Sequence, residues 1–321
     1  MTDGKKQTPP SDISQKRGSE SLRRASDGRS QGSAPRRRAE WLVSLPTLVW
    51  LGLFVVVPTF LVFVIAFRPA NPYGGIGAGW TLENVRALWT PATLAIAWRT
   101  LWISLLTTAI SLVLAIPAGY TIARASARWR NRLLMLVIVP FWTSFLVRVF
   151  AWRSLLHPEG PVKKALETLG LAGPDATLLY HPAAVVLVMV YTFLPFTILP
   201  IYAAAEKFDF RLVEAARDLG ARPFQAFRSV FIPGIRRAIL TAVLVVFIPS
   251  LGSYIIPDLV GGPAGEMLGN KIAQRVFTDR NLPQAAALSA VLVLAVLAPL
   301  VAVLVLQRKS KKADIIMGEA P

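Results

Sequence analysis

Few residues of this chain have the side chains and spacing that covalent chemistry needs. The 321 residues contain no cysteine and only two histidines, His157 and His181. The lack of cysteine excludes disulfides, cysteine-ligated zinc, iron–sulfur clusters and thiol catalysis, and two histidines supply no set of nucleophile, base and orienting group. A phosphate-binding Gly-x-x-x-x-Gly-Lys-Ser/Thr loop is also missing from the sequence, because its nearest approach, Gly265 to Lys271, has different spacing and is followed by Ile272. We therefore expect no catalytic residue, no metal site and no cofactor in this chain.

Two ionisable residues lie within or beside long apolar stretches, where a charge is costly and needs an explanation. Asp258 precedes Leu-Val-Gly-Gly and could bind an ammonium group, cap a loop or pair with a basic residue such as Arg148. Arg148 could gate a passage or pair with a carboxylate, and its long side chain could equally extend to the outer interface. Aromatic rings attract cations, so a passage for cations could also use rings of these stretches, although core packing and interfacial belts use such residues more often. The rings concerned belong to Trp142, Trp152, Tyr191, Phe193, Phe196 and Tyr254.

The most distinctive spacing occurs in a basic segment, residues 206–237, between two apolar stretches. Good helix formers fill 211–219, and Gly220 follows them where a helix commonly ends in a left-handed conformation. Pro223 suits the first turn of a second helix, and Pro233 should interrupt that helix. The pattern predicts a helix, a turn and a second helix.

The first of these helices carries Glu214, Ala215, Ala216, Arg217 and Asp218 in succession. Its two alanines leave one face without bulk, so that another protein can approach the backbone closely, and the charged residues flank that face with both signs. We expect a surface for contact with another protein. In the second helix, Phe224, Phe227 and Phe231 are spaced i, i+3 and i+7, which predicts an apolar stripe packed against the rest of the molecule.

Long apolar stretches must hold these segments in place. Hydrophobic residues make up 54% of the chain and charged residues 17%, with a mean hydropathy of +0.51, whereas an average soluble protein carries about 25% charged residues. A helix needs about 20 apolar residues to cross about 30 Å of hydrocarbon, and every backbone N–H inside it must be bonded within the protein. Six stretches meet that length and predict an all-α integral membrane protein with six transmembrane helices: residues 41–67, 100–123, 133–152, 183–204, 238–257 and 285–306.

The distribution of Lys and Arg predicts which ends of these helices face the cytoplasm. If both termini are cytoplasmic, the inner segments hold 25 of the 35 Lys and Arg residues. Residues 1–40 carry many of them among Ser, Gly and Pro, so we expect a disordered basic cytoplasmic tail. The basic run at 36–38 could bind anionic lipid or nucleic acid, or simply fix the orientation of the first helix. Residues 41–67 are too long for the apolar part of a signal peptide and should remain as a membrane anchor.

The spacing in the basic segment resembles the loop of binding-protein-dependent ABC importer permeases, which reads Glu-Ala-Ala, three residues, Gly, nine residues, Ile-x-Leu-Pro. The chain matches every interval, with Val230 and Ile232 in the Ile and Leu places. The resemblance extends over residues 41–306, and three segments are similar to the B-type permease subunits of spermidine/putrescine importers. They are Pro-Phe-Trp-Thr at 140–143, Tyr-Thr-Phe-Leu-Pro-Phe at 191–196 and Pro-Asp-Leu-Val-Gly-Gly at 257–262.

This resemblance implies the type I permease fold, in which a five-helix core at 97–307 follows one extra helix at 41–67 and includes a cytoplasmic coupling loop at 206–237. It implies a second cytoplasmic tail at 308–321 and a place in the inner membrane of a bacterial cell. The implied partners are a second permease subunit, two ATPase subunits that hold ATP and Mg, and a periplasmic solute-binding protein. Contact with the ATPase is implied for Glu214, Ala215, Ala216, Asp218, Gly220 and Pro233.

The same resemblance implies an importer of polyamines that has no reaction of its own and takes its energy from the partner ATPase. Neighbouring subfamilies carry opines, amino-butyrate-like compounds, phosphonates or ferric iron, so these cargoes are alternatives. The basic charge suits cytoplasmic loops and lipid contact and needs no nucleic-acid partner. A secondary transporter is the competing class, but such carriers generally place acidic or polar coupling groups near the bilayer midplane and often contain repeats. The six apolar stretches contain no Asp or Glu and show no clear repeat.

Overall fold

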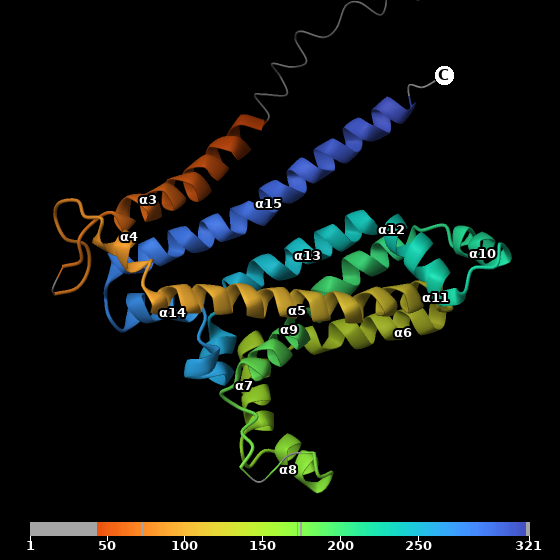
Figure 1. The fold of residues 1–321 in the computed structure, drawn as a ribbon, viewed down its shortest axis with the longest axis horizontal. Coiled ribbons are helices and arrows are strands. Elements are labelled where there is room, and N and C mark those ends of the chain that lie inside the picture. Colours follow the sequence, from red (N-terminus) through yellow and green to blue (C-terminus); the bar gives the residue numbers. More distant parts are fainter. Residues whose placement is uncertain (1–43, 72, 172, 174, 319–321) are drawn as a thin grey trace, which may run out of the picture. The chain divides into compact units, whose positions relative to one another are not determined.

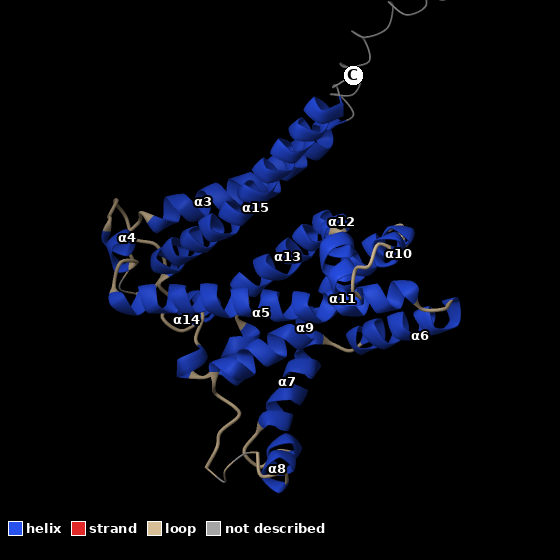
Figure 2. Cartoon of the chain, turned by 45° about the vertical axis from the view of Figure 1, so that its right-hand side comes forward, coloured by secondary structure: helices blue, strands red, loops and turns tan. Residues whose placement is uncertain are grey.

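The computed structural model describes residues 44–71, 73–171, 173 and 175–318. These residues form helices joined by loops, and the β pairing among them is one isolated antiparallel bridge between Ala70 and Ile76 (Figures 1 and 2). The described residues divide into two compact units, one that ends at Leu61 and one that begins at Val62. The all-α prediction is confirmed for the described part of the chain, whereas the expected tail at 1–40 lies outside it.

The first helix of the described residues extends from Ser44 to Ala66 and confirms most of the first predicted span. Its middle, η1 (Gly52–Val56), is a π-helical turn in front of α3 (Val57–Ala66), where the N–H of Val57 donates to the carbonyl of Gly52. Pro58 has no N–H to complete the ordinary helical ladder, and a wider turn beside it is one way in which a helix accommodates a proline.

Three long helices pack on one another at the centre of the second unit (Figure 1): α5 (Pro91–Arg124), α9 (Pro182–Glu206) and α13 (Arg236–Leu251). The Thr90 side chain caps α5 by accepting from the N–H of Thr93, and Pro91 occupies its first turn. Small residues let α5 and α9 approach closely. A Cβ added to Gly119 of α5 would lie only 2.7 Å from Cγ2 of Ile201 in α9.

The prediction of one uninterrupted span at 133–152 is wrong, because the chain turns through 92° within it. There α6 (Ala127–Ile138) passes into a 3-10 turn, η2 (Val139–Trp142), and an extended Thr143 precedes α7 (Phe145–Leu156) and α8 (Pro161–Thr168). Pro140 weakens the helix here, since proline cannot donate the helical hydrogen bond, although Val139 before it keeps helical angles. The chain leaves the helix at Thr143 and Ser144, which are extended.

The predicted span at 238–257 is also broken. The helical segment Pro223–Gly234 meets α13 at 74°, which confirms the interruption predicted at Pro233. However, α13 ends at Leu251 instead of continuing to Pro257, and Gly252 follows at its end. Three short elements that the sequence did not reveal come next: η4 (Pro257–Gly261), η5 (Pro263–Gly265) and α14 (Leu268–Phe277). Glycine and proline residues, both poor helix formers, recur through this stretch and account for the interruptions.

The last helix, α15 (Leu282–Gly318), includes the sixth predicted stretch at 285–306. By length and composition, three helices of the described residues could cross a membrane, or up to five if each bent pair is one span, and Leu282–Ala298 is a shorter apolar helix. A short helix, α4 (Glu83–Ala87), precedes α5. Many large apolar side chains of the second unit are exposed, among them Trp102, Val113 and Leu136, which suits surfaces that meet lipid.

Two of the buried apolar clusters in the second unit support the candidate segments. One lies around Val188 and Met189 of α9 and includes Val260 of η4, so it supports the broken segment that follows α13. The other lies around Ile201 of α9 and includes Phe231, so it supports the basic segment 206–237. The two segments in which the sequence suggested binding therefore rest on different parts of the same helix.

Replacing Gly119 with valine should destabilise the packing of α5 on α9. The new side chain would meet Ile201 and the backbone N of Tyr202, which would lie 3.1 Å from the added Cβ, and overpacking of this kind typically costs about 1–3 kcal/mol. Thr121→Val is the matched control, because it places the same side chain at an exposed position of the same helix. Unfolding in detergent would measure both variants, and an equal midpoint for Gly119→Val and wild type would contradict the close contact.

Candidate functional site

The predicted helix and turn are present in the basic segment. α10 (Arg211–Asp218) is followed by Leu219 and by Gly220, whose φ of +92° lies in the left-handed region. The N–H of Gly220 donates to the carbonyl of Arg217, and the N–H of Ala221 donates to that of Ala216, at 2.9 and 3.0 Å. This pair of bonds is a Schellman motif, which closes the end of a helix. The role predicted for Gly220 in ending the helix is confirmed.

The surface of this turn carries charge around a small hollow. Glu214, Ala215 and Asp218 are exposed, whereas Ala216 is half-buried. A hollow of about 390 Å³ lies between the helix and the start of the next one, and its lining residues are Glu214, Arg217, Asp218, Ala221 and Pro223. Leu219 at the tip of the turn is 90% exposed. The segment thus presents both signs of charge and an apolar tip to its surroundings.

Aromatic rings hold the segment against the end of α5. The ring of Tyr120 makes edge contacts with Phe210, Phe227 and Phe231, with centroids 4.9 to 5.6 Å apart. Phe208 packs on Phe210 and Phe231 in the same way. We call these five rings the aromatic cluster. Such pairs add to the stabilisation that burial alone provides, so the segment and α5 form one packed body.

The phenylalanine stripe predicted in the second helix is correct for two of its three rings. Phe231 is fully buried and Phe227 packs beside it, but Phe224 is 72% exposed. The second helix begins as α11 (Pro223–Ala226) and continues as a π-helical turn, η3 (Phe227–Phe231), before α12 (Ile232–Gly234). A π-helical turn changes the number of residues per turn, so the spacing of an α-helix does not hold there.

Arg124, at the end of α5, reaches the same cluster. Its Nη1 donates to Oη of Tyr120 at 2.7 Å, and its Cζ lies 5.6 Å from the ring centroids of Tyr120 and Phe210. Nη2 lies 4.0 Å from Oε1 of Glu214, but both side chains are substantially exposed, so this ion pair contributes at most about 1 kcal/mol. Sequence reasoning missed Tyr120 and Arg124, because only the fold brings the end of α5 to the segment.

The far end of the segment also docks on the aromatic cluster. Pro233 is exposed within α12, and Gly234 follows it. A Cβ added to Gly234 would lie 2.3 Å from Cε2 of Phe208. The ring of Phe208 therefore occupies the place of a side chain, and the 74° turn into α13 is built around it.

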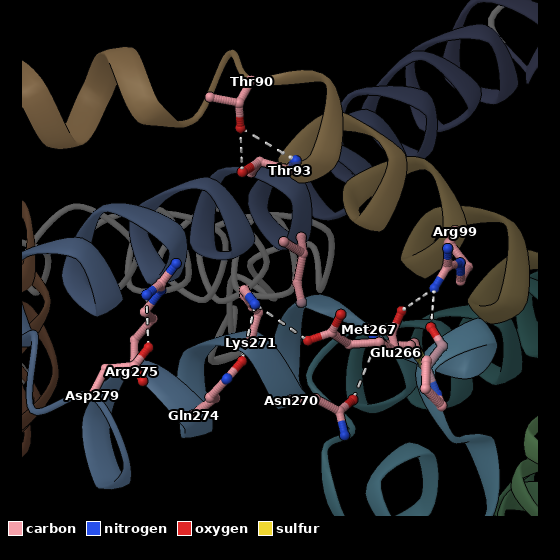
Figure 3. A network of polar contacts seen from close by, with 12 residues as sticks. Thr90, Thr93, Arg99, Glu266, Met267, Asn270, Lys271, Gln274, Arg275 and Asp279 are labelled. Carbon is pink, nitrogen blue, oxygen red and sulfur yellow. Dashed lines mark hydrogen bonds and ion pairs between the residues drawn. The ribbon is translucent and has the colours of Figure 1, made fainter. Parts of the chain in front are cut away.

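A second candidate site is a cavity of about 660 Å³ beside the broken segment after α13. Asp258 and Tyr254, both proposed from the sequence as pathway residues, line it, and so do Glu266, Lys271 and Gln274 of the region around α14. Side chains of α5 and α14 hold the backbone here (Figure 3). Nη1 of Arg99 donates to the carbonyl of Pro263 at 2.9 Å. The N–H of Leu268 donates to Oγ1 of Thr100 at 2.8 Å.

The other four pathway candidates lie elsewhere. Arg148 donates from Nη1 to the carbonyl of Pro140 at 3.0 Å, and its Cζ lies 4.3 Å from the ring centroid of Phe141. Among the described residues it forms no ion pair with Asp258. Two of the remaining rings are packed on other rings, Phe196 on Phe141 and Tyr191 on Trp152. The third, Trp142, is 77% exposed.

The helical fold, with its docked surface segment, is that of an inner-membrane component of a transport system. A model of the family described as binding-protein-dependent transport system inner membrane component matches residues 115–311. The chain belongs to this family and is a multi-pass permease of the inner membrane rather than an enzyme.

Relatives and solved structures agree with this assignment. The chain is 35% identical over 240 residues to the spermidine/putrescine transport system permease protein PotB of Haemophilus influenzae, covering 75% of this chain and 84% of the relative. It is 35% identical over 260 residues to the inner membrane ABC transporter permease protein YdcU of Escherichia coli, covering 77% and 79%. A chain in the crystal structure of a bacterial ABC transporter for alginate has the same fold, with a TM-score of 0.63 at 18% identity over 87% of this chain and 96% of that one.

Replacing Gly220 with valine should loosen the turn after α10. No atom lies within 4 Å of an added Cβ, so the cost is the left-handed backbone itself, about 1–2 kcal/mol for a residue other than glycine. Gly220→Asn is the matched control, since asparagine tolerates this conformation better. Limited trypsin digestion should cut at Arg217 or Arg222 faster in the valine variant than in the asparagine variant, and equal rates for the two would refute the conformational cause.

Proposed function

We propose that this chain is a permease subunit of an ATP-driven polyamine importer and forms part of the path for spermidine and putrescine. The observation that carries the proposal is the similarity, over 75% of the chain, to permeases named for spermidine and putrescine transport. The cavity supports it chemically, because the carboxylate of Asp258 and the ring of Tyr254 line one hollow and both attract ammonium groups.

Other cargoes are alternatives within the same importer class. A relative of Azotobacter vinelandii named for molybdenum transport is 30% identical over 178 residues. The fold therefore accommodates different cargoes, and opines, amino-butyrate-like compounds, phosphonates and ferric iron stay as alternatives for this chain. A secondary transporter is much less favoured, and co-purification with an ATPase separates the two classes.

The proposed topology has six transmembrane helices with both termini in the cytoplasm. Each of the two bent pairs would serve as one span, beside the helix Ser44–Ala66, α5, α9 and α15. This arrangement places the basic segments 124–132 and 206–237 inside and the region of α14 outside, in agreement with the excess of Lys and Arg. The cavity beside Asp258 would then open near the outer end of the path.

The basic segment would couple the permease to a partner ATPase. Closure of the ATPase subunits on ATP would move this segment, and packing of the aromatic cluster on Tyr120 would pass the motion to α5 as a rigid body. The exposed charges and the hollow beside α10 offer the contact surface. The residues proposed for coupling are Glu214, Ala215, Ala216, Asp218, Gly220 and Pro233.

The proposed complex contains a second permease subunit, two ATPase subunits that bind ATP and Mg, and a periplasmic solute-binding protein. The description of the family includes a binding protein. A second solved neighbour, with a TM-score of 0.62, is the alginate transporter in complex with a pentasaccharide-bound periplasmic protein. Both observations support a binding-protein partner on the outer side.

Single cysteines in this cysteine-free chain should report the topology. Leu219→Cys and Ser126→Cys should resist an impermeant thiol reagent in intact cells and react once the cells are permeabilised. Tyr73→Cys and Gly170→Cys should react in intact cells. All four positions are exposed, so burial does not confuse the result. Labelling of Leu219→Cys from outside would invert the topology and separate the segment from any cytoplasmic ATPase.

The cargo can be tested by uptake into proteoliposomes that contain the complete importer. Wild type should take up labelled spermidine and putrescine, and Asp258→Asn should lower that uptake about two- to fivefold, because an exposed charge contributes at most about 1 kcal/mol. Asp279→Asn is the matched control, since Asp279 lies outside the cavity lining. Uptake of a zwitterionic amino acid alone by wild type would reject the polyamine proposal.

A further inference from the structure

The cavity beside Asp258 already contains an ammonium group from the protein itself. Nζ of Lys271 lies 2.9 Å from Oε1 of Gln274 and 3.6 Å from Oε1 of Glu266 (Figure 3). The Lys271 and Glu266 side chains are 26% and 29% exposed, and both line the cavity. The carboxylate of Asp258, by contrast, forms no ion pair with any described residue. One carboxylate of the cavity is thus occupied and the other is open.

The backbone around Glu266 is fixed, whereas the lysine reaches it by a flexible side chain. Nη1 of Arg99 donates to the carbonyl of Glu266 at 3.4 Å, and the N–H of Met267 donates to Oδ1 of Asn270 at 3.1 Å. Nδ2 of Asn270 in turn donates to the carbonyl of Tyr254 at 3.1 Å. The Lys271 ammonium sits at the end of four methylene groups. Lys271 has the longer side chain of the two partners, so its ammonium can move away from Glu266 while the backbone on both sides stays in place.

We propose that Lys271 occupies a cation subsite formed by Glu266 and Gln274, and that an ammonium group of the cargo displaces it. This inference rests on the proposed import of polyamines. A primary ammonium of a polyamine has the same three N–H donors as Lys271, so the two compete for the same acceptor oxygens. A second ammonium on the same alkyl chain would find the open carboxylate of Asp258.

The competition is weak enough for a cargo to win. The Lys271–Glu266 pair is partly exposed, and such pairs stabilise a protein only slightly. A cargo with one ammonium and one carboxylate would gain less. Its ammonium could replace Lys271 at Glu266, but it has no second ammonium for Asp258. Its carboxylate would meet one cation, Lys271, among the charged residues that line the cavity. Lys271 therefore sets a threshold that favours cargoes with two or more ammonium groups.

The test compares substitutions that should change uptake in opposite directions. The complete importer with its binding protein is reconstituted, and the initial uptake of spermidine is measured at concentrations far below saturation. Lys271→Gln should raise the uptake about two- to fivefold, the range that release of a partly exposed ion pair allows. Glu266→Gln should lower it by at least as much. In the double variant, the gain from Lys271→Gln should be lost, because no carboxylate is left to release.

Controls separate this role from a structural one. Lys271→Arg keeps the cation and should behave like wild type. Asp279→Asn breaks the 2.7 Å ion pair between Asp279, which follows α14, and Arg275 of α14. Both residues lie outside the cavity lining, so spermidine uptake should stay unchanged. Lys271→Met gives a second neutral side chain if the glutamine variant fails to assemble. Basal ATP hydrolysis should be equal in wild type and in Asp279→Asn.

The outcomes distinguish this inference from the proposed function. If wild type imports spermidine but both neutral variants of Lys271 show unchanged or lower uptake while Lys271→Arg is normal, displacement of Lys271 is wrong and the polyamine proposal stands. If wild type imports only a different cargo, the polyamine proposal fails and the inference fails with it. A gain in zwitterion uptake equal to the gain in spermidine uptake would also overturn the threshold assigned to Lys271.

Discussion

Backbone groups that lie within a membrane must find hydrogen-bond partners inside the protein, and the breaks between α6 and α7 and after α13 meet that requirement through side chains. Between α6 and α7, Arg148 donates to the carbonyl of Pro140. After α13, Asn270 donates to the carbonyl of Tyr254, and Arg99 donates to that of Pro263. At these two breaks a polar side chain therefore pairs with the backbone within the protein, which explains why charged and amide side chains occur beside apolar stretches.

These hydrogen bonds change the roles that we assign to the polar residues beside the apolar stretches. The sequence left Arg148 open as a gate, as a partner for a carboxylate or as a side chain that extends to the interface. Its bond to Pro140 and its position over the ring of Phe141 give it a structural task at the bend. The carboxylate of Asp258, by contrast, forms no ion pair with a described residue and so has no comparable structural role. Of the two charges first considered for a pathway, Asp258 is thus the one that is free to meet a ligand.

The extent to which the sequence predicted the molecule depends on whether the cause was local. Gly220 and the interruption near Pro233 were predicted correctly, because the preferences of glycine and proline act within a few residues. Apolar length predicted α5 and α9 well, but it could not show that Pro140 would turn the third stretch through 92°. α14 escaped notice because it is short and amphipathic, and it lies between stretches chosen for apolar length alone.

The site followed the same rule. Spacing predicted that Phe227 and Phe231 would pack, and it failed at Phe224, where the following π-helical turn departs from the α-helical period. Tyr120 and Arg124 could not be found from spacing, since they meet the basic segment only through the packing of α5 on it. The cavity likewise combines Asp258 with Glu266 and Lys271. The apolar pattern did not predict the short elements that carry or flank these residues.

The two candidate sites impose opposite physical demands on the same helical frame. The coupling proposed for the basic segment needs rings that are packed tightly, and the contacts of Tyr120 with Phe210, Phe227 and Phe231 meet that need. A site that passes a cation onward must hold it weakly, since tight binding would slow release. Partial exposure of Lys271 and Glu266 keeps their attraction small. Rigid packing at the basic segment and a weak ion pair at the cavity can therefore occur in one protein. The helices α5 and α9 connect the two sites, and the side chains that form one site take no part in the other.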